Sequence, residues 1–132
     1  MQWRMVALAG LVACLGLNAC ERKSVAPVDG GIYSIVSSPE KRTFGVVKVL
    51  KVEPGAVHVR IYGGEYAARP ASVNPGELKV GSIQEGGMGH LPLSPRVFAA
   101  WKPVLITTSR VEPTELEGYD EWRKAGGRVW DQ

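Results

Sequence analysis

The clearest hydrophobic pattern in the chain is the strict alternation across residues 57–62. Apolar side chains occupy one side of this segment, and the other side carries His58, Arg60 and Tyr62. Alternation with a period of two is typical of a β-strand with one buried face. Pro54 and Gly55 precede the segment, at the two central positions of a type II turn. The pattern therefore predicts a hairpin between residues 43–52 and 57–62.

The first arm of this hairpin, residues 43–52, is rich in β-branched residues but does not alternate cleanly. Lys48 and Lys51 interrupt the apolar run at a spacing that no regular strand places on one side. A β-bulge near Val47 would explain the broken alternation, and so would burial of both faces. Both explanations predict a long strand here.

Turn and cap signals place the remaining elements. Further strands are expected at residues 32–37, 78–83 and 104–108, with a last short strand at 128–130. The Ser-Pro pair at 94–95 is typical of a helix start, and Pro103 ends that helix. Thr114 and Glu117 are spaced as a capping box for a second helix. Gly126 then supplies its C-terminal glycine.

This order of elements is typical of an α+β fold. We expect a small, bent antiparallel sheet or a partly open barrel, with two short helices in the C-terminal half. Phe98 and Trp101 share one helical face and are expected in the core between helix and sheet. Residues 32–132 are enough for one globular domain and too few for two.

Residues 1–19 have the parts of a bacterial signal peptide. Arg4 gives a basic start, and an apolar run over residues 5–17 follows. The run Leu-Asn-Ala-Cys that ends at Cys20 resembles the lipobox, in which the cysteine is lipidated and becomes the new N-terminus. There are two alternatives. One is a transmembrane helix, but spanning a bilayer takes about twenty residues. The other is a cleaved signal peptide without a lipid. The sequence thus predicts lipidation of Cys20 and a tether over residues 20–31.

Lipidation would place the protein in the periplasm, held to a membrane by its acyl chains. Glu21, rather than an aspartate, follows Cys20 and favours the outer membrane. Cys14 would leave with the signal peptide, so the mature chain would have no disulfide and would hold together by packing alone. The formal net charge of +3 is too small to indicate a nucleic-acid partner.

Charge is distributed unevenly along the chain. Basic residues outnumber acidic ones between residues 41 and 69, whereas residues 112–121 contain acids and no base. Two solvated faces of opposite sign would explain this, and so would a surface that steers a charged partner. We expect Tyr62 to be exposed, and Tyr and Arg are frequent in binding hot spots. The candidate binding residues are then His58, Arg60, Tyr62, Glu115, Glu117, Asp120 and Glu121.

The sequence contains no assembled catalytic or metal-binding motif. His58 and His90 with an acid could bind zinc, but no motif pairs them. Ser82 follows Gly81 without the nucleophile elbow of a hydrolase. The glycines within 86–89 lack the Gly-Lys-Ser/Thr ending of a phosphate-binding loop. We therefore expect no catalytic residue, no metal and no cofactor.

Two apolar stretches carry a resemblance to a known family. Residues 31–35 followed by residues 44–50 are similar to the opening of small bacterial immunity proteins of the Imm26-like kind, which accompany secreted antibacterial toxins. Residues 90–94, with Phe98, Trp101 and the segment 115–119 downstream, also resemble proteins of such gene neighbourhoods. The resemblance implies a rigid domain that binds an incoming toxin and blocks its active site.

The sequence therefore favours a membrane-anchored periplasmic lipoprotein that binds and inhibits a protein, with immunity to a toxin as the leading hypothesis. The alternative is a structural or assembly lipoprotein that binds another component of the cell envelope. A periplasmic enzyme is the third hypothesis. It would need a pocket near His58 or His90 that also holds an acid and a nucleophile.

Overall fold

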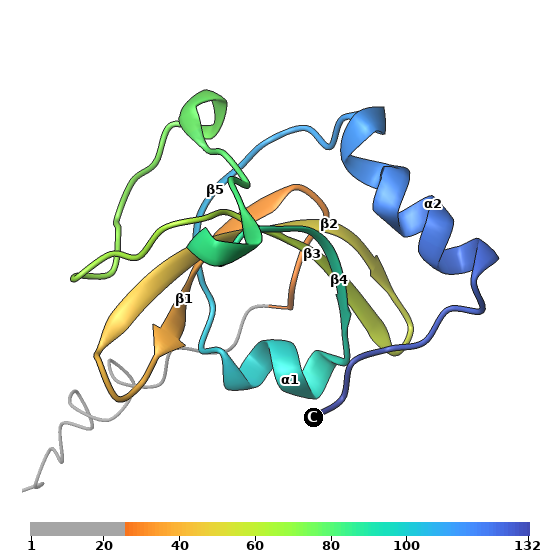
Figure 1. Cartoon of the computed structure of the whole chain (residues 1–132), viewed down its shortest axis with the longest axis horizontal. Helices are drawn as coiled ribbons and strands as arrows, with labels where there is room; N and C mark the ends of the chain where they lie inside the picture. The colour runs from red at the N-terminus through yellow and green to blue at the C-terminus, as the bar shows by residue number, and fades with distance from the viewer. Residues whose placement is uncertain (1–25) are drawn as a thin grey trace, which may run out of the picture.

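The computed structural model describes residues 26–132 and shows one antiparallel sheet with short helices around it (Figure 1). The strands are β1 (Gly31–Ser38), β2 (Thr43–Glu53), β3 (Ala56–Ile61), β4 (Met88–Leu93) and β5 (Val104–Thr108). The helices are η1 (Pro75–Glu77), η2 (Ile83–Glu85), α1 (Pro95–Ala100), η3 (Pro113–Leu116) and α2 (Glu117–Lys124), where η marks a 3-10 helix. The order β4-β3-β2-β1-β5 makes an open sheet with β4 and β5 at its edges. The predicted α+β fold is confirmed.

The hairpin between β2 and β3 forms as the alternating pattern predicts. Gly55 has a φ of 80°, the left-handed value that a type II turn requires at its third position. The ladder shifts once, between the pairs formed by Val49 and Lys51, so Leu50 is the extra residue of a β-bulge. The bulge brings Lys48 and Lys51 to the same face. It lies three residues beyond the position that the sequence indicates.

One face of the sheet packs against α1. The buried side chains between this face and α1 are Tyr33, Ile35, Val47, Val49, Val57, Val59 and Leu93 from the sheet and Val97 and Phe98 from α1. The Ser94 hydroxyl caps α1 by accepting a hydrogen bond from the Val97 N–H at 3.3 Å. The rings of Tyr33 and Phe98 meet edge to face, with centroids 5.5 Å apart. Phe98 therefore lies in the core, as predicted, and the half-buried Trp101 packs against it.

The opposite face of the sheet is covered by residues 63–87 and by the segment that runs from β5 through α2 (Figure 1). Its apolar part consists of Ile32, Val46 and Tyr62, with Val73, Leu78, Val80 and Ile106 packed against them. Its polar part is also buried, and includes Ser34, Lys48 and His58. Arg69 donates to Ser34 O at 3.0 Å and to Ser34 Oγ at 2.9 Å, which ties the loop to β1. Both faces of the sheet are therefore buried.

The predicted strand at residues 78–83 is wrong. Leu78 and Val80 pack on the second face of the sheet, and the Gly63 N–H bonds to the carbonyls of residues 79 and 80 instead of a strand partner. β4 was not predicted from the sequence, because Gly89 and Pro92 within it are typical of a loop. Proline is tolerated there because β4 is an edge strand.

The predicted capping box of Thr114 and Glu117 is wrong: the box is formed by Glu112 and Glu115, two residues earlier, and opens η3 rather than α2. The Glu112 N–H donates to Glu115 Oε2 at 2.8 Å and opens η3, which continues directly into α2. Gly126 follows the helix with a φ of 110°, as its C-terminal position predicts. The short strand expected at residues 128–130 is reduced to a single bridge between Trp130 and Leu93.

Candidate functional site

The three candidate binding residues of the β2–β3 hairpin lie on the covered face. His58 is fully buried, Tyr62 is 8% exposed and Arg60 is half-buried. The prediction that Tyr62 is exposed is wrong, because residues 63–87 fold over this end of the sheet and Tyr62 packs against Ile32. The alternation correctly predicts that these three side chains share a face. It does not reveal that another part of the chain covers that face.

The buried His58 is the centre of a polar row that joins β2, β3 and β4, with Glu53 and His90 half-buried on either side. Its Nε2 lies 3.2 Å from Glu53 Oε2, and its Nδ1 lies 2.8 Å from His90 Nε2. The Tyr119 hydroxyl donates to the other oxygen of Glu53. A carboxylate can only accept, so His58 Nε2 carries a proton; in neutral His58 the Nδ1 then accepts from His90 Nε2–H. Both ring nitrogens of His58 are therefore occupied.

Burial and hydrogen bonding set the protonation states of the row. Desolvation, together with the adjacent His58, lowers the pKa of His90 from 6.5 to about 4. Desolvation also lowers the pKa of His58, against the opposing effect of its Glu53 partner. The hydrogen bond from Tyr119 is the largest cause of the lowered pKa of Glu53. At neutral pH the row thus holds two neutral imidazoles and one carboxylate, and each of its hydrogen bonds then has one donor and one acceptor.

Helix α2 closes over this row. The rings of Tyr119 and Trp122 meet the His58 ring nearly edge to face, with centroid distances of 4.7 and 4.5 Å. Gly118 permits this approach, because a Cβ at that position would lie 2.6 Å from the Cβ of His90. The row therefore docks α2 on the sheet. Among residues 26–132, no group of three or more His, Cys, Asp or Glu side chains is placed to hold a metal ion.

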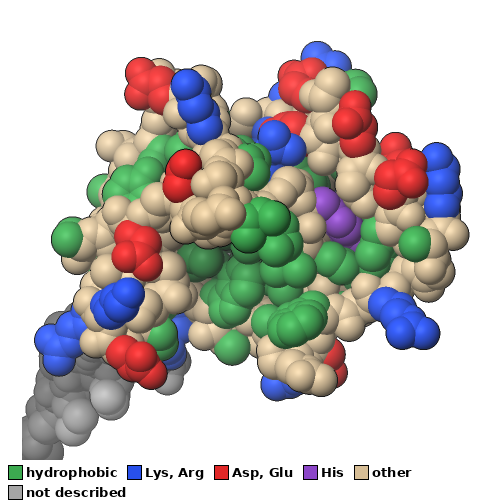
Figure 2. Space-filling view, in the orientation of Figure 1, with side chains coloured by type: hydrophobic (Ala, Val, Ile, Leu, Met, Phe, Trp, Pro, Cys, Tyr) green, Lys and Arg blue, Asp and Glu red, His purple; other side chains and the backbone are tan. Residues whose placement is uncertain are grey.

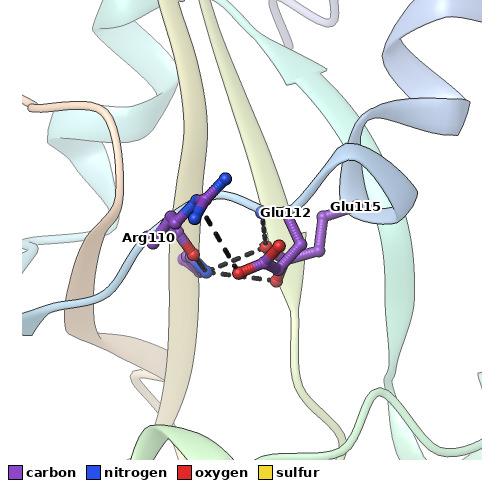
Figure 3. Close-up of polar contacts among 4 residues, drawn as sticks. Arg110, Glu112 and Glu115 are labelled. Atoms are coloured by element: carbon purple, nitrogen blue, oxygen red, sulfur yellow. Dashed lines mark hydrogen bonds and ion pairs between the residues drawn. The ribbon is translucent and has the colours of Figure 1, made fainter.

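Glu115, another candidate binding residue, is engaged inside the molecule (Figure 3). The Lys48 ammonium, whose residue is 3% exposed, donates to Glu115 Oε2 at 2.9 Å and to Arg110 O at 2.7 Å. Figure 3 shows Arg110, Glu112 and Glu115 gathered at this point, ahead of α2. The Glu115 carboxylate thus anchors the segment before α2 to β2, and it is already committed to that ion pair.

The remaining candidate acids, Glu117, Asp120 and Glu121, are exposed on α2. Glu121 pairs with Lys124 at 3.2 Å, and Arg123 lies beside it in the sequence. Figure 2 accordingly shows acidic and basic side chains intermixed on this part of the surface. The uniformly acidic segment of the sequence therefore does not become a uniformly acidic face.

Three exposed apolar side chains that the sequence did not predict lie around β4: Met88 at its first residue, Trp130 beside its last, and Ile83 in η2, which precedes it. Ile83 is 81% exposed, Trp130 is 54% exposed and Met88 is 40% exposed. Backbone hydrogen bonds of 2.8 Å to Pro92 O and from Ser94 N hold Trp130 against β4. Figure 2 shows hydrophobic side chains gathered over this region, between η2 and α1. We call Ile83, Met88 and Trp130 the β4-edge patch.

The sequence carries little signal for this patch. Ile83 and Met88 are five residues apart, among glycines and polar residues, whereas Trp130 lies near the end of the chain. No periodic pattern joins them, and Trp130 comes to β4 only through its bridge to Leu93. An exposed apolar patch of this kind is typical of a site for protein interaction.

Comparison with models of protein families, with curated proteins and with solved structures finds no match to the chain. The resemblance to immunity proteins therefore stays a prediction. No helix within residues 26–132 is long and apolar enough to cross a membrane. Cys20 and the signal peptide lie outside the described residues, so the predicted lipidation is also untested.

Proposed function

We propose that this protein is a periplasmic lipoprotein, attached to a membrane through Cys20, that binds and inhibits another protein. The observation that carries the proposal is the β4-edge patch. Large apolar side chains that face water have an unfavourable hydration free energy, which a matching partner surface relieves. Trp and Met are also enriched in the contact surfaces of protein complexes.

The patch is held by local hydrogen bonds, as an inhibitory surface needs. In η2 the Ser82 hydroxyl accepts a hydrogen bond from the Glu85 N–H at 3.3 Å, next to Ile83. The backbone bonds of Trp130 to β4 fix the other end. A surface with few degrees of freedom loses little conformational entropy on binding. It is therefore suited to occlude a rigid target such as the active site of an enzyme.

We take the partner to be a secreted antibacterial toxin that reaches the periplasm. The lipobox-like run that ends at Cys20 would display the domain in that compartment. Binding with one-to-one stoichiometry is then enough to block the toxin before it reaches its target. A role in immunity would therefore account both for the export signal in the sequence and for the apolar surface in the structure.

The test is protection of a strain that lacks this gene from toxin-secreting neighbours. The wild-type gene should restore survival, and Ile83→Asp should abolish it because a charge replaces the most exposed apolar side chain of the contact. Gln84→Asp is the matched control, since it adds the same charge to the adjacent exposed position of η2 without removing an apolar side chain. Protection by Ile83→Asp equal to wild type would contradict the proposal.

Co-purification separates immunity from the alternative of an assembly lipoprotein. The proposal expects a secreted toxin at one-to-one stoichiometry with the wild-type chain, and its loss with Ile83→Asp. Recovery of a resident envelope component with the same dependence on Ile83 would favour the assembly role and overturn the inhibitory one.

A further inference from the structure

A pocket of about 310 Å³ lies where β1 begins and β5 ends, beside the bulge of β2. Its apolar lining consists of Leu50, Val111 and Leu116, and its charged lining consists of Asp29, Lys51 and Arg110. Two hydrogen bonds, one on either side of the bulge, connect β2 to the segment before β1 at the mouth of the pocket. The Gly30 N–H donates to Val49 O at 2.7 Å, and the Val52 N–H donates to Asp29 Oδ1 at 2.8 Å.

The charges of this pocket suit a small zwitterion that contains a phosphate. Lys51 and Arg110 line the pocket and carry an ammonium and a guanidinium, the two side-chain groups that bind phosphate oxygens. The Lys51 ammonium lies 5.2 Å from the centroid of the Tyr119 ring, so it would turn from that ring to meet a ligand. Asp29 brings a carboxylate, which its bond to Val52 fixes in place. The side chain of Arg110 is 83% exposed, and its contact with Glu112, 3.9 Å from Nε to Oε1, lies in solvent, so turning toward a ligand gives up no buried contact.

The pocket also lies at the point where the tether enters the domain. Asp29 and Gly30 line it, and both belong to the segment that follows Cys20. The nine residues from Cys20 to Asp29 span at most about 30 Å when fully extended. A lipid on Cys20 would therefore keep the pocket within reach of the headgroups of the membrane that holds it.

We propose that this pocket binds the phosphoethanolamine headgroup of a membrane phospholipid, an inference that rests on the proposed lipid attachment at Cys20. The phosphate contacts Lys51 and Arg110, and the ammonium contacts Asp29. The volume of about 310 Å³ is at the small end of the range for ligand sites, which suits a headgroup.

A headgroup contact would set the orientation of the domain. The pocket lies beside β1 and the end of β5, whereas β4 is the opposite edge strand of the sheet. Docking through the pocket therefore turns the β4-edge patch away from the membrane, toward an approaching protein. The anchor alone would leave that orientation undetermined.

The experiment uses the purified, processed protein in non-ionic detergent micelles, labelled with ¹⁵N and titrated with glycerophosphoethanolamine. We expect saturable shifts of the amide signals of Gly30, Lys51 and Val111. Loss of one charge-assisted contact in Arg110→Gln or Lys51→Gln should weaken binding about tenfold. Lys79→Gln is the control, because Lys79 is an exposed lysine outside the pocket and should leave binding unchanged.

Three parallel titrations distinguish the ligand sources. Inorganic phosphate and glycerophosphocholine should bind more weakly than glycerophosphoethanolamine, and Asp29→Asn should remove the preference for the primary amine. Equal binding of inorganic phosphate would show a free-phosphate site, and absence of saturable shifts would show no site; either result overturns the proposal. The intact mass of the same sample reports lipid attachment, so failure of the pocket and failure of the anchor are distinguishable.

Discussion

Acidification should destabilise the protein through the polar row of Glu53, His58 and His90. The pKa of His90 is 6.5 in an unfolded chain and about 4 in the folded protein. Between these values the unfolded chain binds a proton that the native protein does not bind, so the free energy of unfolding falls as the pH falls. The stabilisation is complete above pH 6.5 and is lost as the pH approaches 4. The lowered pKa of His58 acts in the same direction.

The size of the effect follows from the shift of His90. Each unit of pKa corresponds to about 1.36 kcal/mol, so the shift is equivalent to about 3 kcal/mol in the acid limit. Between pH 7.5 and pH 4.5, His90 alone should lower the free energy of unfolding by about 2.5 kcal/mol. The lowered pKa of Glu53 adds a loss of the same sign near and below its usual pKa of 4.5. This is a large part of the usual stability of about 5–15 kcal/mol.

Urea unfolding followed by tryptophan fluorescence at pH 7.5, 5.5 and 4.5 measures the effect, because Trp122 lies against His58. His90→Gln is the matched variant, since an amide N–H can still donate to His58 Nδ1 but does not titrate. The free energy of unfolding of this variant should fall by about 2.5 kcal/mol less than that of the wild type over the same pH range. Equal pH dependence of the two proteins would refute the assigned row, and so would a wild-type stability that does not change with pH.

Three further substitutions test the packing and the anchor. Gly118→Ala should lower the free energy of unfolding by about 1–3 kcal/mol, because the new Cβ collides with His90; a more stable variant, as helix propensity alone would give, would contradict the close approach. Lys48→Met should cost about 3–5 kcal/mol in chemical unfolding, because it leaves Glu115 without its cation, and a neutral effect would show that the pair is solvated. Cys20→Ala should abolish palmitate labelling and release the protein from the membrane fraction; persistent labelling would refute the lipobox.

The local elements were predictable where their signals were local. The hairpin of β2 and β3 follows from period-two alternation and from Pro54-Gly55, and the start of α1 follows from Ser94 and Pro95. A bulge was also expected, although it lies at Leu50. Each of these features depends on residues close together in the chain, so the sequence contains the information directly.

The candidate site was not predictable in the same way. A polar residue in an alternating strand is normally solvent-facing, yet His58 is buried because α2, more than fifty residues later, covers it. Its pairing with His90 depends on the register of β3 against β4, and β4 was not predicted because Pro92 is typical of a loop. Lys48 is buried for the same reason, since its partner Glu115 comes from a distant segment. These contacts are properties of the tertiary fold.

Photo-crosslinking in growing cells tests the central claim most directly. A photoreactive amino acid is placed at Ile83, in the β4-edge patch, or at Leu105, which is also exposed but lies on the opposite edge strand. When toxin-secreting neighbours are present, position 83 should crosslink to one secreted toxin and position 105 should not. Three results would contradict the account: both positions crosslink to the same proteins, position 83 crosslinks only to cytoplasmic proteins, or position 83 crosslinks to no protein.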